Sequence, residues 1–321
     1  MNLHKDQKSF ANAIQAASEY LNIIPVFVEK DYWITLALKR LAESMYRDTV
    51  VFKGGTSLSK GYKLINRFSE DIDIAIIEAT EYSGNRLKGL IRDLEKTISV
   101  DLTEEFVPGL SSKGSRFRKT VFEYPTSGDT RLYRQISQRF TIEINSFANP
   151  FPFKLRTIRS FITEFLLDTE NQAAVDNYGM SPFSLNILDK RRTMIEKIVS
   201  LIRFSFSENP IESLAGKIRH FYDLYYLYHD PECKAYLGAP SFGFDLNELI
   251  EHDKDTFEEP LGWREKEIQD SPILTDFSPI WKRLSNQYRE ELSVLAYSEI
   301  PGEHEIEKTF INILSKVSNL Q

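Results

Sequence analysis

The sequence predicts an α+β fold in which a mixed β-sheet core with N-terminal helices is followed by a helical C-terminal domain. Between residues 49 and 146, short apolar runs alternate with polar residues at a period of two, which is typical of strands. Beyond about residue 176, apolar residues recur at helical spacing and prolines separate the segments. The chain of 321 residues therefore divides into a predicted core, residues 1–175, and a predicted helical domain, residues 176–321.

The predicted elements begin with two helices, at about 5–21 and 28–46, separated by Pro25. The predicted strands lie near 49–53, 71–78, 117–124 and 137–146, with a helix over 82–99 between the second and the third. The predicted C-terminal helices are 189–205, 211–229, 246–256, 278–296 and 304–318.

Asp71 and Asp73 alternate with isoleucines in the second strand, so both carboxylates lie on one face of it. Mg²⁺ usually takes one or two protein carboxylates and leaves its other positions to water and substrate phosphates. Charges in such an apolar strand are costly unless a metal or hydrogen bonds satisfy them. The pattern predicts a site for Mg²⁺, or for Mn²⁺, with a solvated face as the alternative.

A glycine turn follows the first strand, and it consists of Gly54, Gly55, Thr56 and Ser57. Glycines let the backbone approach a ligand closely, and the helix expected over 57–66 offers unpaired N–H groups that suit a phosphate. Thr56 or Ser57 would cap this helix or bind a phosphate oxygen. Gly-Gly alone is a common turn. A phosphate site next to a metal site is much more specific, and the combination indicates nucleotide chemistry.

These motifs, over residues 52–76, resemble the nucleotidyltransferase fold of the DNA polymerase β superfamily, and most closely its AbiEii/AbiGii toxin branch. In the wider superfamily the glycine motif and the first aspartate are usually closer, whereas here fourteen residues separate Thr56 from Asp71. The run from Arg67 to Asp73 is similar to that of the branch. The resemblance implies a polymerase β-like core and a metal-dependent enzyme that transfers a nucleoside monophosphate from an NTP and releases pyrophosphate. It also implies a toxin of an abortive-infection or toxin–antitoxin system, with a role in phage defence.

Other parts of the chain extend the resemblance. Glu143 is the one carboxylate in an alternating strand, and the resemblance implies that it binds metal with Asp71 and Asp73 or deprotonates the acceptor hydroxyl. A solvated edge-strand glutamate is the alternative. The branch also implies that Lys197 binds the triphosphate, with an exposed helix lysine as the alternative.

Two residues further along complete the implied site. Arg219 and Asp223 lie four apart and share a helix face. The resemblance implies that they close the nucleotide site, and an intrahelical ion pair is the alternative. The entry to the second helix, residues 28–33, is also similar to the branch; we interpret it as a packing helix that supports the sheet and assign it no chemistry.

Composition constrains the class of protein. A single cysteine, Cys233, precludes an internal disulfide, and the polar start is unlike a secretory signal. Since no apolar run approaches the ~20 residues of a membrane helix, we expect a cytoplasmic protein without membrane association.

The net charge of −7 is unevenly distributed. Residues 113–159 hold ten Lys/Arg against three Asp/Glu, and residues 245–270 hold ten Asp/Glu against three Lys/Arg. The first segment would bind an RNA backbone. Its arginines interleave with aromatic residues that would stack on unpaired bases, namely Phe117, Tyr124, Tyr133 and Phe140 among Arg116, Arg118, Arg131, Arg134 and Arg139. A solvated sheet surface with core aromatics is the alternative, and the acidic segment is either a solvated face or a docking surface for an antitoxin.

By analogy with toxins of this kind, the expected acceptor is RNA, particularly a tRNA 3′ end. Two other functions stay open. One is the modification of a protein hydroxyl, and the other is a nucleotide-binding partner module that does not turn over its nucleotide.

Overall fold

The computed structural model of the protein describes residues 1–126 and 138–319. These residues form two compact units. Unit 1 contains residues 1–63 and 68–188, and unit 2 contains residues 64–67 and 189–321. The predicted division at 175/176 differs from the boundary of the units at 188/189, because strand β8 (Phe183–Leu188) pairs with strands of unit 1. Whether the chain divides into independent domains at either place stays a prediction.

Unit 1 is built on a mixed sheet that has eight strands in the described part of the chain. The strands are β1 (Val50–Lys53), β2 (Asp71–Ile76), β3 (Thr103–Glu105), β4 (Ser112–Lys113), β5 (Phe117–Glu123), β6 (Arg139–Asn145), β7 (Phe153–Ile158) and β8. Their order is β3-β5-β6-β2-β1-β8-β7, with β4 paired to β5. Since β2 pairs parallel with β6 and antiparallel with β1, the predicted α+β fold with a mixed sheet is confirmed.

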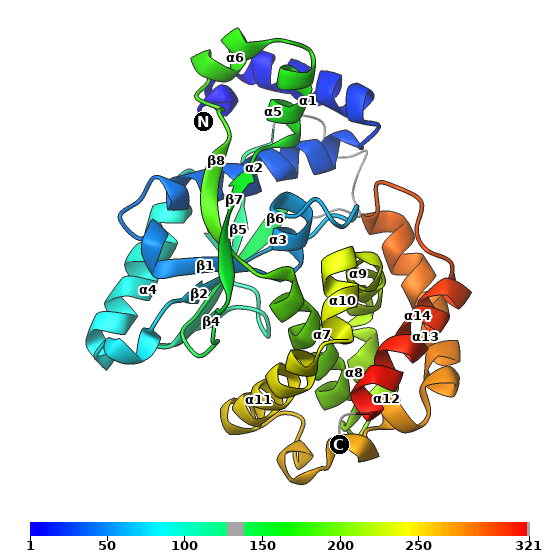
Figure 1. The fold of residues 1–321 in the computed structure, drawn as a ribbon. Helices are drawn as coiled ribbons and strands as arrows, with labels where there is room; N and C mark the ends of the chain where they lie inside the picture. The colour runs from blue at the N-terminus through cyan, green and yellow to red at the C-terminus, as the bar shows by residue number, and fades with distance from the viewer. Residues whose placement is uncertain (127–137, 320–321) are drawn as a thin grey trace. The chain divides into compact units, whose positions relative to one another are not determined.

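The helices of unit 1 are α1 (Gln7–Leu21), α2 (Pro25–Ala42), α3 (Gly54–Lys60), α4 (Gly84–Ile98), α5 (Phe161–Asp168) and α6 (Gln172–Asn177). Helices α1, α2, α5 and α6 lie together at one end of the sheet (Figure 1). Pro25 opens α2, where a proline costs no helical hydrogen bond. Almost the whole of α2 is buried, because it packs against the sheet as well as against α1, α4 and α5.

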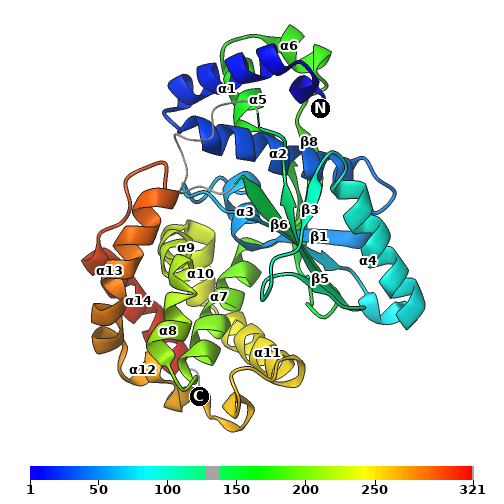
Figure 2. The ribbon, with the colours of Figure 1, turned by 180° about the vertical axis from the view of Figure 1, so that it is seen from behind.

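Unit 2 consists of helices α7 to α14 and short 3-10 turns (Figure 2). The helices are α7 (Lys190–Ser205), α8 (Pro210–Ala215), α9 (Ile218–His229), α10 (Pro231–Leu237), α11 (Pro240–Thr256), α12 (Pro272–Thr275), α13 (Phe277–Leu295) and α14 (Glu303–Ser318). The aromatic core joins α9, α13 and α14 through Phe221, Phe277, Trp281 and Phe310. Among the described helices of the whole chain, none has the length and apolar character needed to cross a membrane.

Several predicted helices are wrong in their extent; the helix expected over 246–256 begins at Pro240, and the one expected over 28–46 ends at Ala42. The helix expected over 57–66 begins earlier, at Gly54, and ends at Lys60; the chain then turns through Lys63, whose φ of +50° is incompatible with helix. The helix expected over 211–229 is broken into α8 and α9 at Gly216 and Lys217. Strands β3, β4, β7 and β8 have no counterpart among the predicted elements.

Candidate active site

The glycine turn packs directly against a carboxylate of the Asp-x-Asp strand. Gly54 has φ +77°, in the left-handed region that favours glycine. A Cβ atom at this position would lie 1.9 Å from Oδ2 of Asp73. Both the backbone conformation and the space therefore require glycine, and the turn and the carboxylate form one site.

Strand register brings a row of charged residues together beside this turn. Lys53 of β1 is paired with Asp73 of β2, which is paired with Glu143 of β6, which in turn is paired with Lys119 of β5. Directly paired residues project from the same face of a sheet. Asp71 lies two residues before Asp73 and shares that face. The structure thus brings the three predicted carboxylates together, flanked by two lysines; the Nζ atom of Lys119 lies 3.4 Å from Oε2 of Glu143.

The carboxylates repel one another, and this fits a divalent cation. Burial raises the pKa of Asp73 well above its ordinary value, and the neighbouring charges of Glu143 and Asp71 raise it further. A divalent cation would offset this repulsion, and hard carboxylate oxygens suit Mg²⁺ or Mn²⁺. Within residues 1–126 and 138–319, no group of three His, Cys, Asp or Glu side chains is arranged to hold a metal by itself. The donor set fits an ion that completes its coordination with substrate phosphates and water.

The two hydroxyls of the turn bind the backbone. Thr56 Oγ1 donates to the carbonyl of Asp71, and Ser57 Oγ donates to the carbonyl of Gly54 at 2.8 Å. Both side chains are buried. In this structure they hold the turn in shape and tie α3 to the start of β2.

In unit 2, the structure pairs two of the predicted nucleotide-binding residues with each other. Lys197 of α7 lies 2.9 Å from a carboxylate oxygen of Asp223 in α9. Arg67 binds the same carboxylate through two hydrogen bonds of 2.7 and 2.6 Å. Burial alone would raise the pKa of Asp223, but the two cations outweigh this effect and hold the pKa below its ordinary value. Two cations therefore share one buried carboxylate.

Arg219 is not part of this cluster. Its Nε donates to Glu291 of α13 at 2.6 Å, and both side chains are about one-third exposed. The alternative of an intrahelical ion pair between Arg219 and Asp223 is therefore excluded, because each binds a different partner.

The predicted stacking surface is corrected for two of its aromatic residues. Tyr124 and Phe140 are 4% and 1% exposed, so they belong to the core and are not available to bases. Arg118 and Arg139 bind carboxylates of α4 and β3 at 2.5 and 3.1 Å, which reduces the free basic surface. Three members of the predicted surface lie outside the described residues, namely Arg131, Tyr133 and Arg134.

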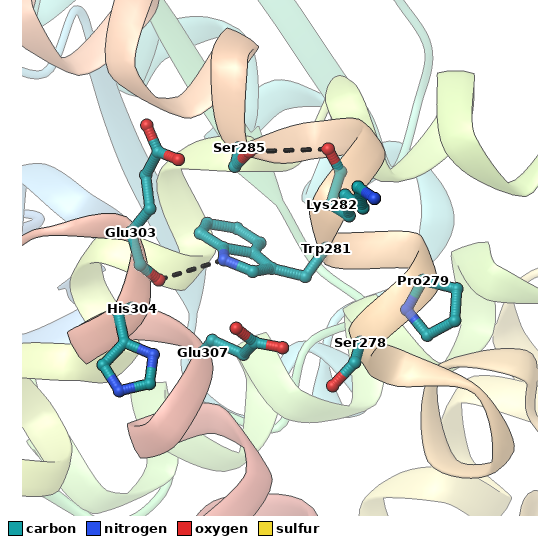
Figure 3. Close-up of a pocket in the computed structure, with 8 residues that line it drawn as sticks. All are labelled: Ser278, Pro279, Trp281, Lys282, Ser285, Glu303, His304 and Glu307. Atoms are coloured by element: carbon teal, nitrogen blue, oxygen red, sulfur yellow. Dashed lines mark hydrogen bonds between the residues drawn. The ribbon is translucent and has the colours of Figure 1, made fainter.

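A separate hollow of about 660 Å³ lies between α13 and α14 within unit 2 (Figure 3). Its lining residues are Ser278, Pro279, Trp281, Lys282, Ser285, Glu303, His304 and Glu307. The Trp281 indole N–H donates to the carbonyl of Glu303 at 3.0 Å, which joins the two helices. None of the predicted site residues lines this hollow.

Two charged residues that were not among the predicted site residues lie directly beside them in the structure. Arg67 binds Asp223, and Lys30 of α2 binds Glu70, the residue before Asp71. No periodicity marks Arg67. The signal for Lys30 was present, because Glu29, Lys30 and Asp31 follow one another in an apolar helix and cannot all face solvent.

Comparisons with known proteins agree with the nucleotide chemistry that the site geometry indicates. The family described as "Nucleotidyl transferase AbiEii toxin, Type IV TA system" matches residues 36–301. The fold is similar to that of MenT4, a nucleotidyltransferase toxin from Mycobacterium tuberculosis, with a TM-score of 0.60 and 13% sequence identity over 96% of this chain and 90% of that one. At that identity the likeness concerns the fold. No curated protein sequence matches the chain.

Proposed function

Because the chain belongs to the AbiEii family of nucleotidyltransferase toxins, we propose that unit 1 transfers a nucleoside monophosphate from an NTP to an RNA hydroxyl, such as a tRNA 3′ end. The observation that carries the proposal is the contact between the glycine turn and the carboxylates. Gly54 lies against Asp73, and strand pairing aligns Asp73 with Glu143. The proposed setting is the cytoplasm, where NTPs and tRNA are abundant.

Asp71 and Asp73 would hold Mg²⁺ or Mn²⁺, with Glu143 as the third carboxylate. When bound, the ion neutralises charge on the phosphates of the NTP. Gly54 and Gly55 let the triphosphate approach the backbone closely, and Thr56 and Ser57 maintain the turn that this requires.

The transfer needs a base for the acceptor. The hydroxyl oxygen forms a bond to the α-phosphorus, the bond from that phosphorus to the pyrophosphate oxygen breaks, and the hydroxyl proton passes to Glu143 or Asp73. Burial, and after it the neighbouring carboxylates, raise the pKa of Asp73, which makes it a stronger base than an ordinary aspartate.

The buried cluster of unit 2 is the proposed source of further nucleotide contacts. Lys197 and Asp223 keep their predicted roles, supported by their direct ion pair and by Arg67, which binds the same carboxylate. A lysine suits phosphate as a compact, mobile charge. Arg219 is retained as a proposed contact with weaker support, since Glu291 already binds it.

The experiment incubates purified protein with Mg²⁺ and each α-labelled NTP in the presence of total tRNA or cell lysate, and separates RNA from protein. We expect label in RNA with the native chain and none with Asp71→Ala. Asp48→Ala is the matched control, since Asp48 lies near β1 but its side chain is 87% exposed. Label in the protein fraction would show that the acceptor is a protein hydroxyl and would contradict the proposed RNA acceptor. NTP binding with no label in either fraction would indicate a binding module and contradict the proposal.

A cognate antitoxin is the proposed protein partner. The acidic segment 245–270, with ten carboxylates against three basic side chains, is the proposed surface for a basic antitoxin. The test is co-expression of the toxin gene with a small gene found next to it, and rescue of growth is the expected result. Growth arrest that the neighbour does not relieve would contradict it.

A further inference from the structure

Helix α2 buries three consecutive charged side chains for which the proposed reaction gives no role. Glu29, Lys30 and Asp31 are only 8%, 0% and 3% exposed. Burying a charge is costly unless it is paired and hydrogen-bonded. The family match begins at residue 36, beyond all three. The residues that Lys30 and Asp31 bind indicate the role of these buried charges.

Lys30 holds the residues that lead into the first metal-site carboxylate. Its ammonium forms an ion pair with Glu70, which directly precedes Asp71. The same ammonium lies 5.6 Å from the ring centroid of Phe68, and Phe27 of α2 stacks on that ring at 4.7 Å. An ion pair and a ring stack from one helix thus fix residues 68–70.

Hydrogen bonds from β6 and α3 also fix the backbone where this segment, residues 68–70, joins β2. The carbonyl of Glu70 accepts the N–H of Thr141 at 2.9 Å, and Thr56 Oγ1 donates to the carbonyl of Asp71. The backbone of Asp71 is therefore held by β6 and α3, and Glu70 beside it is held by Lys30. Burial lowers the pKa of Lys30, whereas the charges of Glu70 and Asp71 act against this and favour the ammonium.

Asp31 anchors α2 itself. Its carboxylate lies 2.5 Å from Nζ of Lys60, the last residue of α3, and accepts the N–H of Phe161 at 2.8 Å. Adjacent residues of α2 thus bind both ends of the loop between α3 and β2: Asp31 binds Lys60 and Lys30 binds Glu70. Neither end can shift without breaking a buried contact.

We propose that Lys30 is a positioning residue for the metal site, and that it acts through Glu70 to fix Asp71 relative to the glycine turn. The inference rests on the proposed function in so far as Asp71 binds the metal. Residues that orient metal ligands from behind typically change metal affinity by about 10–100-fold when they are removed. A helix that only supports the fold would not have this effect.

The test measures binding of Mn²⁺ alone by electron paramagnetic resonance, with no substrate present. We expect Lys30→Met and Glu70→Gln each to weaken Mn²⁺ affinity by about tenfold or more. The double variant should be no weaker than either single one, because both act through the same contact. Lys30→Arg should recover part of the affinity, since it keeps the charge.

Lys39→Met is the matched control. Lys39 is another buried lysine of α2, but it donates to the carbonyls of Gly179 and Ser181 at 2.9 and 3.3 Å, on a different side of the unit. We expect it to leave Mn²⁺ affinity within about twofold, since it touches no residue next to a metal ligand. If Lys30→Met fails to fold, Glu70→Gln carries the test, because Glu70 is one-third exposed and the substitution keeps the size of its side chain.

Native Mn²⁺ affinity in both Lys30→Met and Glu70→Gln would overturn the inference, as would an equal loss in Lys39→Met. Unchanged affinity in Asp71→Ala would overturn it too, because the metal would then lie elsewhere. If Asp71→Ala, Lys30→Met and Glu70→Gln weaken Mn²⁺ binding as expected but the native chain transfers no nucleotide, only the proposed function would be contradicted.

Discussion

Replacement of Gly54 by alanine separates the two reasons for glycine at the turn. An L-residue in the left-handed region costs about 1–2 kcal/mol. The added Cβ would also lie 1.9 Å from Oδ2 of Asp73, and ordinary contact begins at 3.4 Å, so the oxygen must move by about 1.5 Å (3.4 minus 1.9). The same Cβ would lie 2.9 Å from Cγ and 3.2 Å from Cβ of Asp73, so rotation of the carboxylate does not remove the clash and the backbone of the turn or of β2 must shift as well.

Gly109→Ala is the matched control, because Gly109 has φ +78° and nothing lies within 4 Å of its Cβ position. Gly109→Ala should lose about 1–2 kcal/mol of unfolding free energy in urea, and Gly54→Ala should lose more because it adds the clash with Asp73 to the same backbone cost. Only Gly54→Ala should lose activity. A misplacement of about 1 Å can cost on the order of 100-fold in rate, equal to about 2.7 kcal/mol of transition-state stabilisation.

The assay is the initial rate of nucleotide transfer at saturating NTP and Mg²⁺, measured beside urea unfolding on the same preparations. Native activity in Gly54→Ala would refute the close approach of turn and carboxylate. An equal loss of activity in Gly109→Ala would refute the assignment of that loss to Asp73.

Three other predictions concern stability and metal. Burial raises the pKa of Tyr32 to about 12 from an ordinary 10.0, because the folded chain favours the neutral phenol. The contribution of this side chain to the free energy of unfolding is therefore complete below pH 10 and is lost as pH rises towards 12. Tyr32→Phe should therefore reduce the slope of stability against pH in that window by about 1.4 kcal/mol per pH unit, and an unchanged slope would contradict this. Arg67→Met should cost about 1.5–3 kcal/mol in urea unfolding, because it removes the charge-assisted hydrogen bonds to Asp223 while Lys197 still pairs with that carboxylate, whereas Arg219→Ala should cost no more than about 1 kcal/mol because its pair is about one-third exposed. Chelation of divalent metal by EDTA should abolish transfer and added Mg²⁺ should restore it; transfer that persists in EDTA would contradict the proposed use of metal.

Strong local patterns in the sequence predicted the centre of the fold. The alternation of Asp71 and Asp73 with isoleucines established both the strand and the shared face of the carboxylates, and burial of Ile72 and Ile74 at 1% and 0% confirms it. The same reasoning placed Glu143 in a strand, although only the register shows that it lies directly beside Asp73. Periodicity gives the face of a side chain and leaves its neighbour on the next strand undetermined.

The charged partners could not be predicted, because they join residues far apart in the chain. Arg67 and Asp223 are 156 residues apart, and Lys30 and Glu70 are 40 apart. Ion pairs of this kind leave no periodic signal: three consecutive charges in α2 indicate that at least one of them is buried, but they do not show which residue pairs with it. The strand β8 was missed for a related reason, since its membership of the sheet depends on its pairing with β1 and β7.

The measurement that tests the central claim most directly compares the native chain with Asp73→Asn, which keeps the shape of the side chain and removes its charge. With Mg²⁺, NTP and tRNA, the native chain should release one pyrophosphate for each nucleotide joined to RNA. Asp73→Asn should lower both rates together by about 100-fold or more, since it removes a group that acts on the reacting phosphate. Equal rates in the two proteins would contradict the assignment of nucleotide transfer to this site.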